Sequence, residues 1–264
     1  MARSRKEHQP FLGRSLSSFP QHCTTGANTS ERAPQTHPGR VLATPGPFPM
    51  PPRLPAELGP GDRVTLATDA RWEAIVIRGD FSGQLAEDIE ISGCRLTSAS
   101  FSGARLPRAR LSDTVFERCD LSAAVLSQAA LTRVEFADCR LSGADLSGAR
   151  LQDVLFSECR LVDVNLRMAA GARVRFDGCN LAGADLYAAQ LPGACLFDSD
   201  LTGAELSRAN LVGGRLHGSA LGALKGAAAL RGTTVSSAQV MAVALQVLGV
   251  LEINIDDERE PPAR

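Results

Sequence analysis

A large apolar residue recurs at every fifth position of this 264-residue chain, from Ile91 to Leu221. Each of these positions holds Leu, Ile or Phe, with the single exception of Gly171. An α-helix repeats about every 3.6 residues and a β-strand about every two, so neither produces a strict period of five. A chain that repeats one short unit this often is typical of a solenoid, in which each turn rests on its neighbours.

A second period, of twenty residues, lies on top of the first. Two rows of identical residues show it, namely Phe116, Phe136, Phe156 and Phe176, and Cys119, Cys139, Cys159 and Cys179. Because four five-residue units make up this period, we expect four units to close one coil. Equivalent residues then stack on one face of successive coils, which lie about 4.8 Å apart in a β-solenoid. The resulting rod is too narrow to hold a ligand inside.

The position two places before each apolar centre holds a small residue, from Cys94 to Ser219. One large and one small inward residue per unit fill the interior, and the other three positions face water. The cysteine row is therefore interpreted as core, because a straight row of thiols cannot converge on a tetrahedral zinc ion. Cys195 lies one place out of this phase, a position compatible with solvent exposure. We expect Gly171 to leave a gap in the core and a bend or bulge at about 169–172.

The repeated unit resembles that of the pentapeptide-repeat family, Ala-(Asp/Asn)-Leu-X-X. The segments ADLSG at 144–148, ADLYA at 184–188 and ANLVG at 209–213 match this pattern in full. The resemblance covers roughly residues 72–253. It implies an all-β fold, a right-handed quadrilateral β-helix, to which the sequence adds a C-terminal capping α-helix. Members with assigned functions include proteins that bind DNA gyrase by imitating duplex DNA and so protect it from fluoroquinolones. Most members have no assigned activity.

Changes in composition and in the repeat divide the chain into five expected segments. They are a leader over residues 1–56, an N-terminal cap with an irregular first coil over 57–90, the solenoid over 91–221, a C-terminal cap with a helix over 222–253, and a flexible tail over 254–264.

The leader is rich in proline and poor in acidic residues. Nine of the fifteen prolines precede Pro55, and Glu7 and Glu31 are the leader's acids. Such a composition predicts disorder. The leader fits either a transit peptide or an over-extended gene start that leaves Met50 as the first residue. After it, the alternation of Ile75 and Ile77 predicts a first strand, and we expect Trp72 to cover the open end of the core.

The repeat gives way to a helix at about 236–251, where Ser236 and Gln239 have the spacing of a capping box. More apolar side chains lie on this helix than sealing one coil end requires, which indicates an interface. In the family's gyrase-protecting members such an end mediates dimerisation. The candidate homodimer residues are Val240, Met241, Val243, Leu245, Val247, Leu248 and Leu251. In the alternative, a monomer, the last coil and residues 222–233 bury both faces of the helix.

The sequence offers no recognisable catalytic, cofactor-binding or metal-binding site. His217 is the only histidine of the repeat region, and no glycine-rich phosphate-binding motif is present. Carboxylates project from separate turns of a convex rod, which lacks the cleft that acid–base catalysis needs. We therefore expect a protein that is not an enzyme and has no cofactor.

The charges of the repeat region nearly cancel. Between Phe81 and Leu221 there are 17 acids and 14 arginines, whereas duplex DNA carries one negative charge per about 1.7 Å. Asp113, Arg133, Asp153 and Arg173 are predicted to form a charge-alternating ladder that stabilises one face. The most acidic strip, diluted by Arg118 and Arg175, is the candidate partner-facing surface, and it consists of Glu117, Glu135, Asp138, Glu158, Asp177 and Asp198.

These features predict a protein-interaction or structural module with an unidentified protein partner. The alternative is a DNA-mimicking binder of DNA gyrase that gives fluoroquinolone protection. No secretory or membrane-spanning segment is recognisable, so we expect a cytoplasmic protein that binds neither membranes nor nucleic acid directly.

Overall fold

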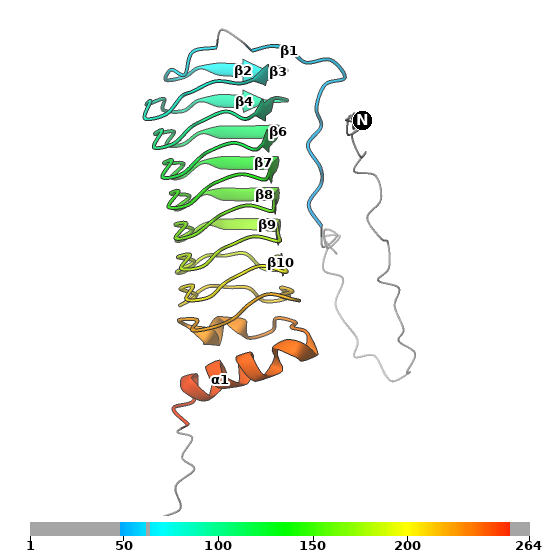
Figure 1. Cartoon of the computed structure of the whole chain (residues 1–264), viewed down its shortest axis with the longest axis vertical. Coiled ribbons are helices and arrows are strands. Elements are labelled where there is room, and N and C mark those ends of the chain that lie inside the picture. Colours follow the sequence, from blue (N-terminus) through cyan, green and yellow to red (C-terminus); the bar gives the residue numbers. More distant parts are fainter. Residues whose placement is uncertain (1–47, 62–63, 254–264) are drawn as a thin grey trace, which may run out of the picture. The chain divides into compact units, whose positions relative to one another are not determined.

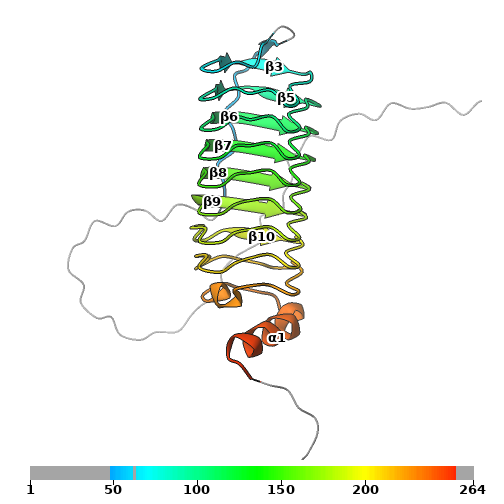
Figure 2. The ribbon, with the colours of Figure 1, turned by 90° about the vertical axis from the view of Figure 1, so that its left-hand side faces the viewer.

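The computed structural model describes residues 48–61 and 64–253, which belong to one compact unit. They form a parallel β-solenoid of about seven coils, which appears as a stack of ribbons (Figure 1, Figure 2). The regular elements are, in chain order, β1 (Gly59–Pro60), β2 (Arg71–Glu73), β3 (Ile75–Ile77), β4 (Glu90–Ser92), β5 (Arg95–Thr97), β6 (Arg110–Glu117), β7 (Ala130–Ala137), β8 (Arg150–Ser157), β9 (Ala170–Asp177), β10 (Cys195–Phe197), the 3₁₀-helices η1 (Ala227–Leu230) and η2 (Ser237–Gln239), and α1 (Val240–Val250).

From β4 to Lys225, successive coils of the solenoid pair in parallel with a register of twenty residues, and only the last bridge, from Arg215 to Thr234, is one residue shorter. Phe116 of β6 lies opposite Phe136 of β7, which lies opposite Phe156 of β8. Single bridges such as Val125 to Asp145 keep the same register outside the strands. The predicted closure of one coil by four units is therefore confirmed.

We name the four faces of a coil A to D after their apolar centres, which in one coil are Leu121, Leu126, Leu131 and Phe136. Strands β6 to β9 run through faces C and D without interruption, whereas faces A and B carry single bridges separated by turns. The residue two places after each centre forms the corner to the next face. Its backbone is left-handed, with φ of 49° at Asp113 and 53° at Arg133. Glycine and short polar residues adopt this conformation most easily, and no β-branched residue occupies this position from Gly83 to Gly218.

The core follows the five-residue rule. The centres and the small residues two places before them are buried, except Gly171 and Ala209, which are half-buried, and Phe136, Phe156 and Phe176 are fully shielded from solvent. Ring centroids of the phenylalanines on face D are 4.7, 4.9 and 4.8 Å apart along the row from Phe116 to Phe176. These separations match the spacing between stacked β-strands.

Trp72 closes the N-terminal end of the core, as predicted. It is buried in β2, and its ring centroid lies 5.3 Å from that of Phe81 and 6.5 Å from that of Phe101. The strand predicted at Ile75 and Ile77 is β3, but it is not the first strand, because β1 and β2 precede it.

The C-terminal end of the core is closed by Gln239. The Ser236 N–H donates to Oε1 of Gln239 at 2.8 Å, which confirms the capping box, although the first turn is the 3₁₀-helix η2 and α1 begins only at Val240. The Nε2 group of the buried Gln239 donates to the carbonyls of Leu216 and Ser219, both at 2.6 Å. The Leu216 carbonyl also accepts from the Ser219 N–H at 3.2 Å, so the Gln239 amide adds a second donor there and supplies the donor that the Ser219 carbonyl of the last coil needs.

The bend or bulge predicted at about 169–172 is wrong. Strand β9 passes through Gly171 in unbroken register with β8, opposite Leu151. A Cβ atom at Gly171 would lie 2.1 Å from the Leu151 carbonyl oxygen, so the paired backbone of β8 leaves no room for a larger residue in this conformation. The change of structure comes one coil later, where a turn with a hydrogen bond from the Ala194 N–H to the Leu191 carbonyl replaces the continuous strand.

The structure also corrects the expectation for Cys195, which is 1% exposed. This residue stands in the outward row of face D, in register with Arg175 on one side and Arg215 on the other. Burial raises the pKa of its thiol, which disfavours the reactive thiolate.

Candidate functional site

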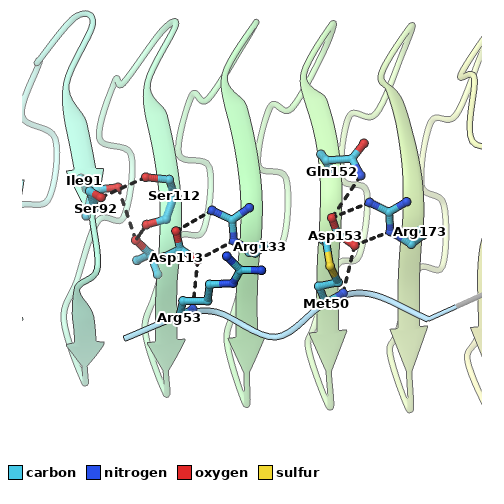
Figure 3. A network of polar contacts seen from close by, with 11 residues as sticks. Met50, Arg53, Ile91, Ser92, Ser112, Asp113, Arg133, Gln152, Asp153 and Arg173 are labelled. Atoms are coloured by element: carbon cyan, nitrogen blue, oxygen red, sulfur yellow. Dashed lines mark hydrogen bonds and ion pairs between the residues drawn. The ribbon is translucent and has the colours of Figure 1, made fainter. Parts of the chain in front are cut away.

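The predicted charge ladder lies at the corner between faces C and D, where it forms two ion pairs (Figure 3). Arg133 donates to both carboxylate oxygens of Asp113 at 2.6 Å. Arg173 likewise holds both oxygens of Asp153, with its Nη2 at 2.7 Å from Oδ2. Such two-point pairing is the strongest form of the arginine–carboxylate contact. The predicted ladder is confirmed.

The ladder carries a second set of contacts that the sequence did not predict. The backbone N–H of Met50 donates to Oδ1 of Asp153, and that of Arg53 donates to Oδ1 of Asp113, both at 2.9 Å (Figure 3). We call residues 48–56 the strap, because they run alongside the coils before the chain reaches β1 (Figure 1). Disorder is predicted for residues 1–56, but residues 48–56 are held on the solenoid. The predicted end of the disordered leader is therefore wrong. Residues 1–47 lie outside the described residues, as does the predicted tail at 254–264.

Both ends of the strap also contact the solenoid. The Arg175 guanidinium lies between the rings of Phe48 and Phe197, 5.1 Å from each centroid. At the other end, a Cβ atom on Gly93 would lie 3.2 Å from Cδ of Pro55, so any larger residue would push the proline away, and the backbone of Gly93 is left-handed, which also favours glycine.

The electrostatics of the ladder keep both carboxylates ionised. Burial by itself would raise the pKa of Asp153, but hydrogen bonds from Arg173, Met50 and Gln152 outweigh it and lower the pKa to about 2. The hydrogen bond from Arg133 lowers the pKa of Asp113, against the effect of burial. A carboxylate with lone pairs left over by its arginine is a good acceptor for a backbone N–H.

The six residues of the acidic strip all belong to face D or to the corner that follows it. Arginines neutralise part of the strip, since Arg95 pairs with Glu117 and Arg175 pairs with Asp177 at 2.6 Å. Burial, reinforced by the nearby Glu117 carboxylate, raises the pKa of Glu135. The exposed remainder is a single corner row formed by Asp138, Glu158 and Asp198.

The helix α1 leaves most of its predicted interface residues in solvent. Met241 is 72% exposed, Leu251 61% and Val240 58%, and Leu245 and Val247 are also exposed. Val243 and Leu248 are half-buried, and Val243 packs against the core. The helix therefore seals the last coil with one side and presents an apolar side outward.

The cysteine row is part of the core, as predicted. Its thiols also donate hydrogen bonds to backbone carbonyls of the preceding coil. The Cys139 thiol donates to the carbonyl of Phe116, 23 positions earlier, at 3.4 Å. Cys159 repeats this bond, the Ser199 hydroxyl makes it in a later coil, and the Gln239 amide makes it at the end. A shared hydrogen bond explains why Cys, Ser and Gln occupy one row at twenty-residue intervals.

No group of three or more His, Cys, Asp or Glu side chains that could hold a metal ion occurs among residues 48–61 and 64–253. His217 is exposed, and its ring lies edge-on to Phe197 with the centroids 6.1 Å apart. In the same part of the chain, no helix has both the length and the apolar character needed to cross a membrane.

Comparisons with known proteins find the repeat in other sequences. Residues 89–166 match the pentapeptide repeat region family, and residues 159–203 match the family of pentapeptide repeats (8 copies). No curated protein sequence matches the chain.

Among solved structures, the chain is similar to QnrB1, a plasmid-mediated fluoroquinolone resistance protein. The two are 24% identical over 69% of this chain and 96% of QnrB1, with a TM-score of 0.39. It is also similar to HetL, a pentapeptide repeat protein involved in heterocyst differentiation regulation from the cyanobacterium Nostoc sp. strain PCC 7120. That match is 23% identical over 64% of this chain and 91% of HetL, with a TM-score of 0.27. The five-residue core rule, the twenty-residue register and the two matches together identify residues 89–203 of this chain as a pentapeptide-repeat region.

Proposed function

We propose that this protein is a non-catalytic binding module that forms a homodimer through α1 and binds a further protein partner. The observation that carries the proposal is the apolar outer side of α1. Soluble proteins rarely leave a contiguous apolar patch in water unless it is an interface. A second copy is the simplest occupant, because a two-fold contact of α1 with itself closes the assembly and prevents growth into a filament.

Sedimentation tests the dimer with a matched pair of variants. Met241→Asp places a charge on the outer side of α1, whereas Met168→Asp places one on a solenoid corner, where Met168 is 61% exposed. We expect the wild type and Met168→Asp to sediment as dimers at micromolar concentration and Met241→Asp to sediment as a monomer. A monomeric wild type would contradict the dimer.

The second candidate function is DNA mimicry toward DNA gyrase, which the family resemblance implies. The observation in its favour is the exposed corner row of Asp138, Glu158 and Asp198. The ion pairs of Glu117 and Asp177 count against it, because they interrupt the negative surface beside that row.

A supercoiling assay with gyrase separates the two candidates. Mimicry requires inhibition or quinolone protection by the purified protein, with loss of the effect in a double Asp138→Lys, Glu158→Lys variant. Asp163→Lys, on a different corner, is the control and should retain the effect. Absence of any effect from the wild type would remove gyrase from consideration.

A further inference from the structure

The strap has the composition of a polyproline II helix. Four of the eight residues from Phe48 to Pro55 are proline. Proline fixes φ near about −65° and biases the residue before it toward extended backbone. A proline also has no N–H, so the non-proline residues supply every backbone donor in this segment.

The distance between the two N–H donors of the strap matches the distance between the two carboxylates of the ladder. Met50 and Arg53 are three residues apart, and their acceptors Asp153 and Asp113 are two coils apart. Three residues of polyproline II span about 9.3 Å, and two coils span about 9.6 Å. One full turn of the strap therefore covers the distance between successive carboxylates.

The alternation of charge creates this spacing. Because Arg133 stands between Asp113 and Asp153, carboxylates occur on every second coil, and each arginine fixes the orientation of the carboxylate beside it. Gly93 and the Arg175 guanidinium bound the row at its two ends, where they receive Pro55 and Phe48. The corner thus provides acceptors at a fixed interval and two end contacts for one extended segment.

The strap is held there by few contacts. Phe48 and Met50 remain 48% and 42% exposed, and the two N–H bonds to Asp113 and Asp153 are its polar contacts with the ladder. Segments with little buried apolar surface open with a small free energy.

We propose that the corner between faces C and D is a binding site for polyproline II segments and that the strap is its resident ligand. The partner is a protein with a proline-rich segment that carries backbone N–H groups three residues apart. It binds when the strap leaves, by the recognition of a preformed extended helix. The site goes beyond the dimer proposed above and does not involve α1.

The test uses the full chain with Met50→Pro, which removes the N–H that donates to Asp153 and keeps the polyproline II backbone. Ala56→Pro, which adds a proline outside the two contacts, is the control. The first measurement is the rate of tryptic cleavage after Arg53, followed by mass spectrometry. We expect cleavage at least about tenfold faster in Met50→Pro than in the wild type or the control.

The second measurement is fluorescence anisotropy with a labelled peptide of residues 47–56. We expect it to bind Met50→Pro at least about tenfold more tightly than the wild type, whose strap competes with it. A peptide with proline at the positions of Met50 and Arg53 should not bind. Unchanged cleavage would show that the Met50 N–H does not hold the strap on the solenoid. Faster cleavage without peptide binding would show that the corner holds only the protein's own strap and does not bind a separate segment. Either result overturns the proposal, and neither affects the dimer measurement.

Discussion

At the scale of the residue, the interior of the solenoid is so narrow that each inward side chain packs between the equivalent side chains of the two adjacent coils. Phe136 stacks between Phe116 and Phe156 with interplanar angles of 16° and 4°. Hydrogen bonds between neighbouring coils fix the distance between them. The coils therefore cannot move together to fill a void in the core. A close-packed interior of this kind responds strongly to changes in volume.

Phe136→Ala is expected to lower the free energy of unfolding by about 2–5 kcal/mol, because the cavity cannot collapse. Leu146→Ala, on face B, should behave in the same way. Denaturant titration measures both, with Met168→Ala as the exposed control. A loss below about 0.5 kcal/mol would place these side chains outside the core.

Gly171→Ala is expected to destabilise the protein by about 1–3 kcal/mol, as overpacked sites do. The physical reason is the 2.1 Å approach of the new Cβ atom to the Leu151 carbonyl oxygen, which the strand pairing fixes in place. Denaturant midpoints of the variant and the wild type check this. A gain in stability would show that the Leu151 carbonyl can move aside to accommodate the new Cβ atom.

At the scale of the element, the strap forms no helix or strand. It is held in place by hydrogen bonds to the side chains of β6 and β8. Its two polar anchors depend on the carboxylates of the half-buried Asp113 and the buried Asp153, which remain ionised. The cost of burying Asp153, which is 1% exposed, is offset by Arg173, Gln152 and the Met50 N–H.

The contribution of Asp153 to stability should depend on pH with a definite sign. Its folded pKa of about 2 lies below the ordinary value of about 3.9. The stabilisation is therefore fully present above about pH 4 and is lost as the pH falls toward about 2. Urea unfolding between pH 5 and pH 2 should show a steeper decline for the wild type than for Asp153→Asn. Asp138→Asn, at an exposed corner, should follow the wild type, and parallel curves for all three proteins would contradict the prediction.

At the scale of the whole molecule, a solenoid must protect the two ends of its sheets. Unpaired strand edges pair readily with other chains. Trp72 and its ring neighbours close one end, and Gln239 with α1 closes the other. The apolar side of α1 is then free to form the proposed dimer.

Gln239→Leu is expected to keep the packing at the C-terminal end and to remove the two donors. The Ser219 carbonyl would lose its amide donor and the Ser236 N–H would lose its acceptor, whereas the Leu216 carbonyl would keep its bond from the Ser219 N–H, so we expect a cost of about 1–3 kcal/mol. We also expect concentration-dependent association beyond the dimer, measured by sedimentation, because a coil edge becomes available. Gln190→Leu, at an exposed position, is the control. Unchanged stability together with unchanged sedimentation would show that Gln239 does not protect this end.

Local rules made much of this protein predictable from its sequence. The five-residue pattern decides which side chains face inward, so the register, the phenylalanine stack and the ladder of Asp113, Arg133, Asp153 and Arg173 followed from spacing alone. The capping box of Ser236 and Gln239 was visible for the same reason, because its members are three residues apart.

Only the tertiary structure decided the features that depend on separate coils. The strap is anchored to carboxylates 103 and 60 positions away in the chain, and no local pattern reports such contacts. The burial of Cys195 depends on its neighbours in register, and the fit at Gly171 depends on a carbonyl of the preceding coil. The sequence determined the repeating coil because each unit contains its own inward and outward residues. Contacts across coils, and the strap laid along them, exist only once the coils have stacked.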